Sequence, residues 1–380
     1  MVGCLRTGPN TTQVRYITPP RLEETCLGTR IVCYRPVRHG SPAFFIEKKD
    51  GQYIVHNYGH GGNGWTLGPG AASYVIDLLQ QQIPDEVTKT SNITVVGAGV
   101  LGLLTALELV KRGYRRITMV ADQFDNLTSH NAGGLLATTF LKTDNHTQNI
   151  INDMAIYSYR FYAQIVTGCH PLVKKGAARM SVYLPYSEAD RFDPYVAAGV
   201  MQPGKKVNLD FRNGTIRSIV GFDDGIFMDI GVLMQSLADL LRPYVTFKKQ
   251  KIARFGEINT KIIINCTGWG AKDLANDTHV TAAIGHLILL KNQDPNHLKY
   301  MLSVHSGPNY SSPNPATKRF LCVFPKRMPG ALPGEVGVIG GTYHEDTHRP
   351  LDDTNEFDLI LQRAKQFYGL REEKAPFNTI

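Results

Sequence analysis

Residues Asn92 to Gly113 read NITVVGAGVLGLLTALELVKRG. The run Ile93 to Val96 is apolar and mostly β-branched, which predicts a buried strand. It ends in a Gly-x-Gly-x-x-Gly pattern, after which apolar residues recur at helical spacing until Gly113 ends the helix. A second apolar run, Ile117 to Val120, follows and ends at Asp122. This order predicts a strand–turn–helix–strand unit, which is typical of an α/β fold.

Each glycine of this unit has a physical task in binding a dinucleotide. Gly97 permits the tight turn, Gly99 lets the backbone approach a pyrophosphate, and Gly102 lets the helix pack closely on the strand. The helix N-terminus adds free N–H groups and a partial positive charge, and Asp122 lies at the separation expected of a residue that accepts hydrogen bonds from a ribose. The predicted contacts are Gly97, Gly99, Val100, Leu101, Gly102 and Asp122. The unit alone does not separate NAD from FAD.

Five further blocks lie on either side of this unit. The first, Asp125 to Leu136, places a hydroxyl-bearing loop before a turn of small residues. The second, Lys261 to Leu274, is an apolar strand that runs into a Thr-Gly turn, and the third is a short GGT at residues 340–342. Near the N-terminus stand RPVR at residues 35–38 and HNYGHGGNGWT at residues 56–66. Turns of small residues let a backbone approach a flat ring closely.

Together these blocks resemble the D-amino-acid oxidase family of FAD-dependent enzymes. The family's VVGAGVxGL, AAGL, INCTG, GGT, RPVR and HNYGHGGxG blocks all have counterparts here, and the YGHGG block is long and specific. The resemblance covers about residues 25–79, 93–137, 220–290 and 320–345. The stretch 138–219 matches poorly, and there we expect variation in the part that binds substrate.

The order of the blocks departs from the family. RPVR and HNYGHGGxG lie near the family's C-terminus, after GGT, but here they precede Gly97. The simplest interpretation is a circular permutation, in which residues 80–92 are the linker that joins the former ends. About a dozen extended residues reach roughly 40 Å, which is ample to join two ends on one domain surface.

The resemblance implies a two-domain fold of the α/β (α+β) kind. One domain is a Rossmann-like FAD-binding domain, and the other is a substrate domain built on a mixed or antiparallel sheet. The expected FAD-binding domain consists of residues 52–140, 215–280 and 335–345. The expected substrate domain consists of residues 13–51, 141–214, 281–334 and 346–380.

The resemblance also implies the chemistry of a D-amino-acid oxidase. A hydride passes from the substrate Cα to flavin N5, and the imino acid then gives a 2-oxo acid, ammonia and H2O2. Arg35 matches the family's carboxylate-binding arginine, a role that suits a planar guanidinium; the alternative is a structural ion pair with an acid. The Gly62 carbonyl matches the acceptor for the substrate amine. We expect Arg38 to be structural and His60 to be buried and hydrogen-bonded.

The expected cofactor is tightly but noncovalently bound FAD. The residues matched to its isoalloxazine ring are Gly61, Gly62, Asn63, Gly64, Trp65 and Thr66. Those matched to the following loop are Thr128, Ser129, Gly133, Gly134 and Leu135. Ile252 through its backbone, Thr267 and Gly268 would approach the phosphate or adenosine part. The alternative for the glycine-rich block is a turn without a ligand.

One departure from the family concerns the substrate. The family places a tyrosine that binds the carboxylate where this chain has Cys322. Tyr310, from the preceding loop, either supplies that hydroxyl or is incidental. Lys318, Arg319 and Lys326 either suit an acidic substrate side chain or form a solvated cationic face.

Several functions remain open at this point. The first is oxidation of a D-amino acid, with an acidic one among the candidates. The alternatives in the same fold are a glycine- or sarcosine-type amine oxidase and a quinone-linked dehydrogenase. From a different class, the chain could be a non-catalytic FAD-binding protein. An NAD-linked dehydrogenase is disfavoured, because the YGHGG and Ala-Gly-Gly-Leu blocks would have no role in it.

Composition adds limits. With 380 residues, 42% hydrophobic and 19% charged, the chain is expected to form two interlocking globular domains. The net charge of +8 is dispersed, which favours a basic surface over a nucleic-acid site. The six cysteines form no CxxC pair, so neither a disulfide framework nor a metal site is indicated.

The start of the sequence lacks the apolar stretch of a signal peptide. The longest apolar stretch, Ile93 to Val110, contains three glycines and Glu108 and is explained by the dinucleotide unit rather than by a membrane span. We expect a cytoplasmic protein without stable membrane insertion. Its expected partners are a small amino-acid or amine substrate and O2 or a quinone as electron acceptor, with no nucleic acid. The oligomeric state is left open.

Overall fold

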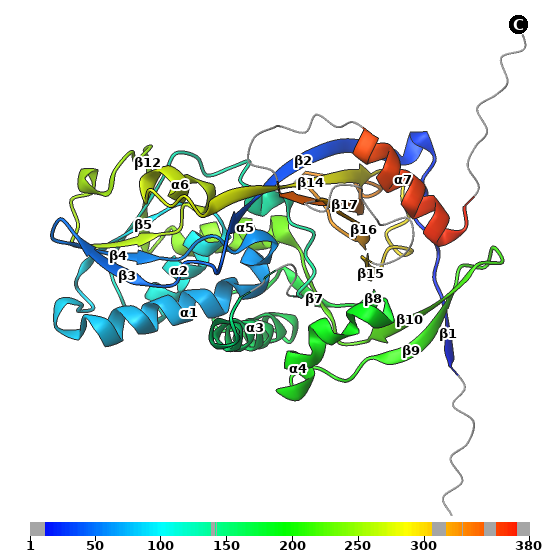
Figure 1. The fold of residues 1–380 in the computed structure, drawn as a ribbon, viewed down its shortest axis with the longest axis horizontal. Coiled ribbons are helices and arrows are strands. Elements are labelled where there is room, and N and C mark those ends of the chain that lie inside the picture. Colours follow the sequence, from blue (N-terminus) through cyan, green and yellow to red (C-terminus); the bar gives the residue numbers. More distant parts are fainter. Residues whose placement is uncertain are drawn as a thin grey trace, which may run out of the picture.

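A computed structural model describes residues 12–137, 141, 143–305, 317–328, 330–345 and 355–370. Figure 1 shows an elongated molecule with a β-sheet at each end and helices packed on both. The smaller sheet has six strands and the larger has nine, and a two-stranded ribbon of β7 (Ala177–Arg179) and β11 (Ile226–Met228) completes the β-structure of the described residues. The expected α/β two-domain class is confirmed.

The six-stranded sheet contains the dinucleotide unit. Its order is β12-β6-β5-β13-β4-β3, and all neighbours are parallel except β3 and β4. The strands are β3 (Ile46–Lys49), β4 (Gln52–His56), β5 (Asn92–Val96), β6 (Arg116–Ala121), β12 (Val245–Lys249) and β13 (Ile262–Asn265). The two strands expected from the sequence are β5 and β6. Central parallel strands are covered on both faces, which is why they are almost wholly apolar.

Helices α1 (Gly64–Gln82), α2 (Val100–Lys111) and α5 (Ile230–Leu241) cover one face of this sheet. The opposite face packs on the short turns η6 (Phe255–Glu257) and α6 (Ala271–Leu274). Successive residues of a strand point to opposite faces. In β13, Ile262 and Ile264 accordingly pack on the face that α1, α2 and α5 cover, and Ile263 packs on the face that η6 and α6 cover.

The nine-stranded sheet has the order β1-β9-β10-β8-β15-β16-β17-β14-β2. Its strands are β1 (Gln13–Tyr16), β2 (Leu27–Arg38), β8 (Ser181–Leu184), β9 (Lys205–Asp210), β10 (Ile216–Phe222), β14 (Val280–Leu290), β15 (Tyr300–Val304), β16 (Thr317–Phe324) and β17 (Val338–Glu345). Helix α7 (Asn355–Tyr368) packs on the outer face, and α3 (Asn145–Val166) and α4 (Asp193–Ala197) lie on the inner side (Figure 1). Alternation in β16 therefore turns Phe320, Cys322 and Phe324 inward and Leu321 and Val323 toward α7.

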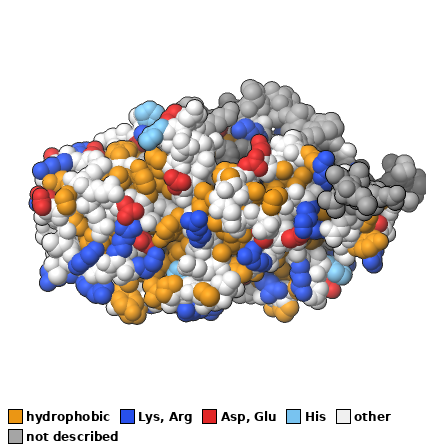
Figure 2. Space-filling view, turned by 90° about the horizontal axis from the view of Figure 1, so that it is seen from below, with side chains coloured by type: hydrophobic (Ala, Val, Ile, Leu, Met, Phe, Trp, Pro, Cys, Tyr) orange, Lys and Arg blue, Asp and Glu red, His pale blue; other side chains and the backbone are white. Residues whose placement is uncertain are grey.

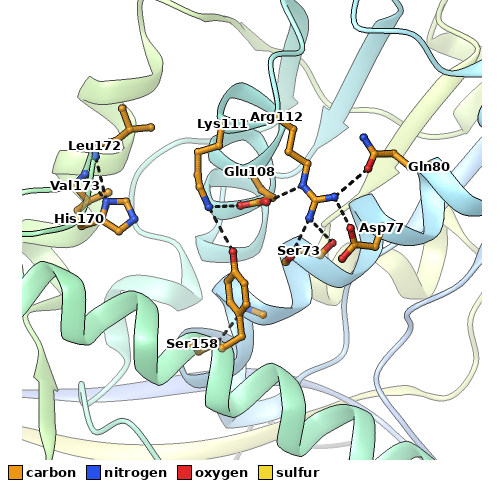
Figure 3. Close-up of polar contacts among 12 residues, drawn as sticks. Ser73, Asp77, Gln80, Glu108, Lys111, Arg112, Ser158, His170, Leu172 and Val173 are labelled. Atoms are coloured by element: carbon orange, nitrogen blue, oxygen red, sulfur yellow. Dashed lines mark hydrogen bonds and ion pairs between the residues drawn. The ribbon is translucent and has the colours of Figure 1, made fainter. Parts of the chain in front are cut away.

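The N-terminal segment is part of both sheets. Its strands β1 and β2 form the two edges of the nine-stranded sheet, and β4 and β3 extend the six-stranded one. Arg112, the residue that directly follows α2, joins α1 to the dinucleotide unit, as Figure 3 shows. Its guanidinium donates to Asp77 Oδ1 at 2.5 Å and Ser73 Oγ at 2.9 Å, and its Nε donates to Glu108 Oε1 at 2.7 Å.

Helix α1 differs from the expected one. The sequence predicts a helix at about Gly70 to Gln80, after the glycine-rich block, but the structure begins it at Gly64, so the last residues of the block, Gly64 to Thr66, form its first turn. Within the helix Gly70 serves close packing, because a Cβ there would lie 2.2 Å from the Met154 carbonyl oxygen of α3. The linker between α1 and β5 is also shorter than the expected residues 80–92, because α1 continues to Gln82, and it contains a turn, η3 (Pro84–Glu86).

Three strands pair in a different sheet from the one that the expected domain ranges imply. The strand β3 joins the six-stranded sheet, although it lies within residues 13–51. Strands β10 and β17 join the nine-stranded sheet, although they fall in 215–280 and 335–345. A block matched to the cofactor can lie on either sheet, because both sheets contribute to one cavity. The domain ranges themselves remain a prediction.

Candidate active site

A cavity of about 1150 Å³ lies between the two sheets. The carboxyl ends of β4, β5, β6, β12 and β13 open onto it, as expected for ligand sites of parallel sheets. The predicted residues that line it are Arg35, Gly61, Gly62, Gly64, Trp65, Thr66, Gly97, Gly99, Val100, Leu101, Asp122, Thr128, Ser129, Gly133, Gly134, Leu135, Ile252, Thr267 and Gly268. Gly102 and Asn63 lie behind the wall, and Tyr310 lies outside the described residues.

The glycines of the dinucleotide unit have the expected geometry. Gly97 has φ +104°, a region in which residues with a side chain are strained, and a Cβ there would lie 2.4 Å from the Cys266 carbonyl oxygen. A Cβ on Gly102 would lie 2.0 Å from the Gly97 carbonyl oxygen, so Gly102 serves helix–strand packing. Ser129 Oγ accepts the N–H of Val100 at 2.9 Å and thereby joins the following loop to the start of α2.

The loop around Gly134 is fixed from both sides. Trp65 Nε1 donates to the Ser129 carbonyl at 3.0 Å, and the Met228 N–H donates to the Gly134 carbonyl at 2.7 Å. A Cβ on Gly133 would lie 2.6 Å from the Phe324 ring. The backbone of this loop therefore lies directly on the cavity wall between the two sheets.

The end of the cavity beside β6 contains the acidic residue that the sequence predicts there. Asp122 follows β6 and lines the cavity. Its carboxylate has no hydrogen-bond or ion-pair partner among the described residues. The Thr267 hydroxyl donates to Asn265 Oδ1 at 2.7 Å, and this hydrogen bond stabilises the turn that leads into Gly268. An unpaired carboxylate at the end of the second strand suits a ribose.

Arg35 and Arg38 lie on the same strand, β2, in different surroundings. Arg38 Nε donates to Asp277 Oδ2 at 2.7 Å, and the Tyr58 hydroxyl donates to the same oxygen at 2.8 Å. Burial raises the pKa of Asp277, but the bonds from Arg38 and Tyr58 outweigh it and lower that pKa to about 2. Arg38 is therefore structural, as the sequence suggested.

Arg35, in contrast, has no carboxylate partner among the described residues. Its Nη1 donates to the Thr342 carbonyl at 3.2 Å, and its guanidinium lies across Gly285, where a Cβ would be 2.3 Å from Nη1. The guanidinium carbon lies 5.9 Å from the centre of the Tyr343 ring. The alternative interpretation, a structural ion pair, thus has no partner in the described structure, and the charge is available at the cavity wall.

His60 differs from its expected description. The side chain is buried, 2% exposed, as expected, but neither ring nitrogen has a hydrogen-bond partner among the described residues. Burial lowers the pKa of His60 to about 3, so the ring is neutral. Because His60 lines the cavity, its two polar atoms fit a site whose partner is a bound group.

Two of the three cationic residues considered for an acidic substrate, Arg319 and Lys326, bind other groups of the protein. Arg319 donates to both carboxylate oxygens of Glu356 on α7, at 2.5 and 3.2 Å. Lys326 is 3% exposed, and its ammonium donates to the carbonyls of His130 and Ala132 at 2.6 and 3.0 Å. The prediction that Lys326 belongs to a solvated cationic face is therefore wrong, because its ammonium is buried and binds carbonyls of the loop around His130.

Other lining residues were not found from the sequence. Ile284, Leu287 and Phe320 give apolar walls to the end of the cavity that Arg35 lines, and Ser303 and His305 add polar groups beside Cys322. Burial raises the pKa of the Cys322 thiol to about 12, so it stays a neutral thiol. No motif marks these positions; the only signal was the inward alternation of β15 and β16.

The family follows from comparison with known proteins. The family model described as FAD dependent oxidoreductase, DAO, matches residues 92–376. The chain belongs to this family. Its cofactor is accordingly FAD, and the cavity fits that cofactor through the glycine turn at Gly97, the free Asp122 carboxylate and the unpaired nitrogens of His60.

Two curated relatives carry the name D-amino-acid oxidase. The one from Dictyostelium discoideum is 23% identical over 226 residues, which are 56% of this chain and 62% of the relative. The one from Streptomyces coelicolor is 24% identical over 292 residues, 75% of this chain and 80% of the relative. The chain thus spans less than two thirds of the Dictyostelium protein.

Two solved structures share the fold. The glycine oxidase from Bacillus cereus has a TM-score of 0.51 and 17% identity, and the match covers 73% of this chain and 77% of that one. The L-proline dehydrogenase from P. horikoshii has a TM-score of 0.52 and 12% identity, with 74% and 78% covered.

Within the described residues, no helix combines the length and apolar character needed to cross a membrane. Likewise, no group of three or more His, Cys, Asp or Glu side chains there has the geometry of a metal site. On the face seen in Figure 2, Lys and Arg side chains are scattered among acidic and apolar ones.

Proposed function

We propose that this chain oxidises the CH–NH2 group of a D-amino acid with FAD as the acceptor. The observation that carries the proposal is the Arg35 guanidinium, which faces the cavity without a carboxylate partner in the described structure. A planar guanidinium binds a carboxylate through two parallel hydrogen bonds. The names of the two curated relatives support the D-amino-acid class.

The residues of the site would position the substrate rather than take its protons. FAD, when bound, supplies the acceptor for a hydride from the substrate Cα. Arg35 would hold the carboxylate, and the Gly62 carbonyl would accept a hydrogen bond from the amine. Ile284, Leu287 and Phe320 would exclude water from the reacting carbon. Hydrolysis of the resulting imino acid gives a 2-oxo acid and ammonia.

No proton carrier is required beside the reacting carbon. His60 is neutral near pH 7, because burial lowers its pKa to about 3. The Cys322 thiol is also neutral, because burial raises its pKa to about 12. A site with neutral groups and one fixed cation suits binding of a carboxylate and direct hydride transfer.

The substrate side chain is proposed to be small and neutral. Two of the cations considered for an acidic side chain, Arg319 and Lys326, donate to Glu356 and to backbone carbonyls. Glycine-type substrates are a second candidate, because one of the solved structures with the same fold is a glycine oxidase. The electron acceptor is proposed to be O2, giving H2O2, with a quinone as the alternative.

We also infer that the chain is circularly permuted. The family model begins at residue 92, the first residue of β5, and leaves the N-terminal segment unmatched. That segment nevertheless supplies Arg35, the YGHGG block and strands of both sheets. The turns between α1 and β5 would then be the joint between the former ends.

The visible spectrum of the purified protein tests the proposal first. A yellow protein should be bleached anaerobically by D-alanine or D-serine more readily than by D-aspartate, and not by the L forms; faster bleaching by D-aspartate would overturn the neutral side chain. Bleaching by glycine or sarcosine alone would replace the D-amino-acid class with the second candidate. A yellow protein that no amine reduces would favour a non-catalytic flavoprotein.

A further inference from the structure

A chain of four polar side chains ends at the substrate side of the cavity. Ser303 lies on β15, His305 follows that strand, and Glu188 and Arg191 lie on η5 (Tyr186–Phe192). Arg191 Nη2 is 2.7 Å from Glu188 Oε2 and 2.8 Å from His305 Nδ1. His305 Nε2 is 2.9 Å from Ser303 Oγ. Ser303 and His305 line the cavity.

The direction of these hydrogen bonds is fixed by chemistry. A guanidinium only donates, so His305 Nδ1 must accept from Arg191. Burial and the charge of Arg191 lower the pKa of His305 to about 2, so the ring is neutral and carries its one proton on Nε2. That proton is donated to Ser303 Oγ. The Ser303 hydroxyl proton must therefore go to a different acceptor.

No such acceptor is present among the described residues. Ser303 is 3% exposed, and its hydroxyl has His305 as its one hydrogen-bond partner among the described residues. A buried hydroxyl proton without an acceptor is costly. Since Ser303 lines the cavity, an acceptor inside the cavity would satisfy it.

The position of Ser303 indicates which acceptor. Ser303 is directly opposite Cys322 in the register of β15 and β16. On the other side of β16 lies β17, and Arg35 reaches across β14 to donate to the Thr342 carbonyl of β17. The hydroxyl of Ser303 and the guanidinium of Arg35 thus flank Cys322, where the resemblance expects a tyrosine hydroxyl.

We propose that Ser303 donates its hydroxyl proton to the substrate carboxylate held by Arg35, in place of the missing tyrosine. His305, Arg191 and Glu188 act as positioning residues that turn the Ser303 proton toward the cavity. The proposal rests on the proposed function, because it assumes a substrate with a carboxylate. A carboxylate only accepts hydrogen bonds, so it matches both the hydroxyl and the guanidinium.

Ser303→Ala in the flavin-loaded protein tests the proposal. A hydrogen bond to a charged group is worth enough that its loss should raise KM about 10- to 100-fold, with kcat changed less. Dissociation constants for propionate and benzoate, read from the flavin's visible spectrum, should rise by a similar factor. Flavin content should be unchanged, since Ser303 lies at the substrate end.

Variants of His305 separate positioning from bulk packing. His305→Leu should reproduce the loss seen with Ser303→Ala, because the Ser303 proton is no longer directed. His305→Gln can accept from Arg191 and donate to Ser303, so it should restore part of the affinity. The matched control is Ser218→Ala, at an exposed position of β10 in the same sheet, and this variant should behave as wild type.

The outcomes also distinguish this proposal from the proposed function. If wild type oxidises an amino acid while Ser303→Ala keeps the wild-type KM and carboxylate affinity, the role of Ser303 is refuted and the reaction stands. If no amine is oxidised but carboxylates bind, and bind more weakly to Ser303→Ala, the reaction fails and the role stands. If wild type binds no carboxylate, both are refuted.

Discussion

The two ends of the cavity use different chemistry. At the cofactor end the backbone forms the wall, and glycines such as Gly97 and Gly134 are required because a Cβ would collide with neighbouring carbonyl oxygens. At the substrate end side chains form the wall, and Arg35, Ser303 and Cys322 come from three different strands. Backbone recognition leaves a glycine pattern in the sequence, whereas side-chain recognition depends on register between strands.

Removing the N-terminal segment should have the largest effect. Deletion of residues 1–80 takes away β1 to β4 and most of α1, so apolar faces of both sheets lose their partners. We expect insoluble protein without flavin, measured by the soluble fraction and its absorbance. A truncated protein that stayed soluble and yellow would show the segment to be an appendage and would contradict the permutation.

Acid should release the cofactor completely. Burial raises the pKa of the Cys266 and Cys322 thiols, which both line the cavity, to about 12, so neither is a thiolate near pH 7. Acid precipitation should leave a colourless pellet and a yellow supernatant. Colour that remains in the pellet would instead indicate a covalent bond at this end of the cavity.

Arg35→Leu should disable the substrate end alone. Loss of one side of a buried charge pair costs about 2–5 kcal/mol, so kcat/KM should fall roughly 30- to several-thousand-fold. Arg35→Lys should recover only part of the loss, because an ammonium keeps the positive charge but cannot form the two parallel hydrogen bonds of a guanidinium. Flavin absorbance should be retained in both. Full activity of Arg35→Leu, or activity restricted to amines without a carboxylate, would demote Arg35 to the scaffold.

A substitution at Asp277, the partner of Arg38, should affect stability rather than substrate binding, in contrast to the change at Arg35. Asp277→Asn weakens the bonds to Arg38 and Tyr58 and should lower the free energy of unfolding by about 2 kcal/mol. The folded pKa of Asp277 is lowered from 3.8 to about 2, so its contribution is present above pH 4 and is lost as the pH falls toward 2.

Denaturant unfolding of wild type and Asp277→Asn between pH 2 and pH 7 measures this difference. The two curves should converge at the acid end of the range. A constant gap across the range would mean that the charge of Asp277 does not act through Arg38.

The sequence by itself determined the dinucleotide unit, the family and most of the cavity's cofactor wall. These features are local: a strand, a glycine turn and a helix within Asn92 to Gly113 impose their own geometry. The YGHGG block was recognised equally well, although the helix that follows it begins at Gly64, earlier than the sequence suggested.

Only the tertiary structure decided which of the two arginines of RPVR is free, that Lys326 lies buried under a loop, and that Ser303 is paired with Cys322. Each of these depends on partners far away in the chain. Asp277 neutralises Arg38, two carbonyls bind Lys326, and strand register sets Ser303 opposite Cys322. A residue's type fixes which hydrogen bonds it can make, but the fold fixes which partner is within reach.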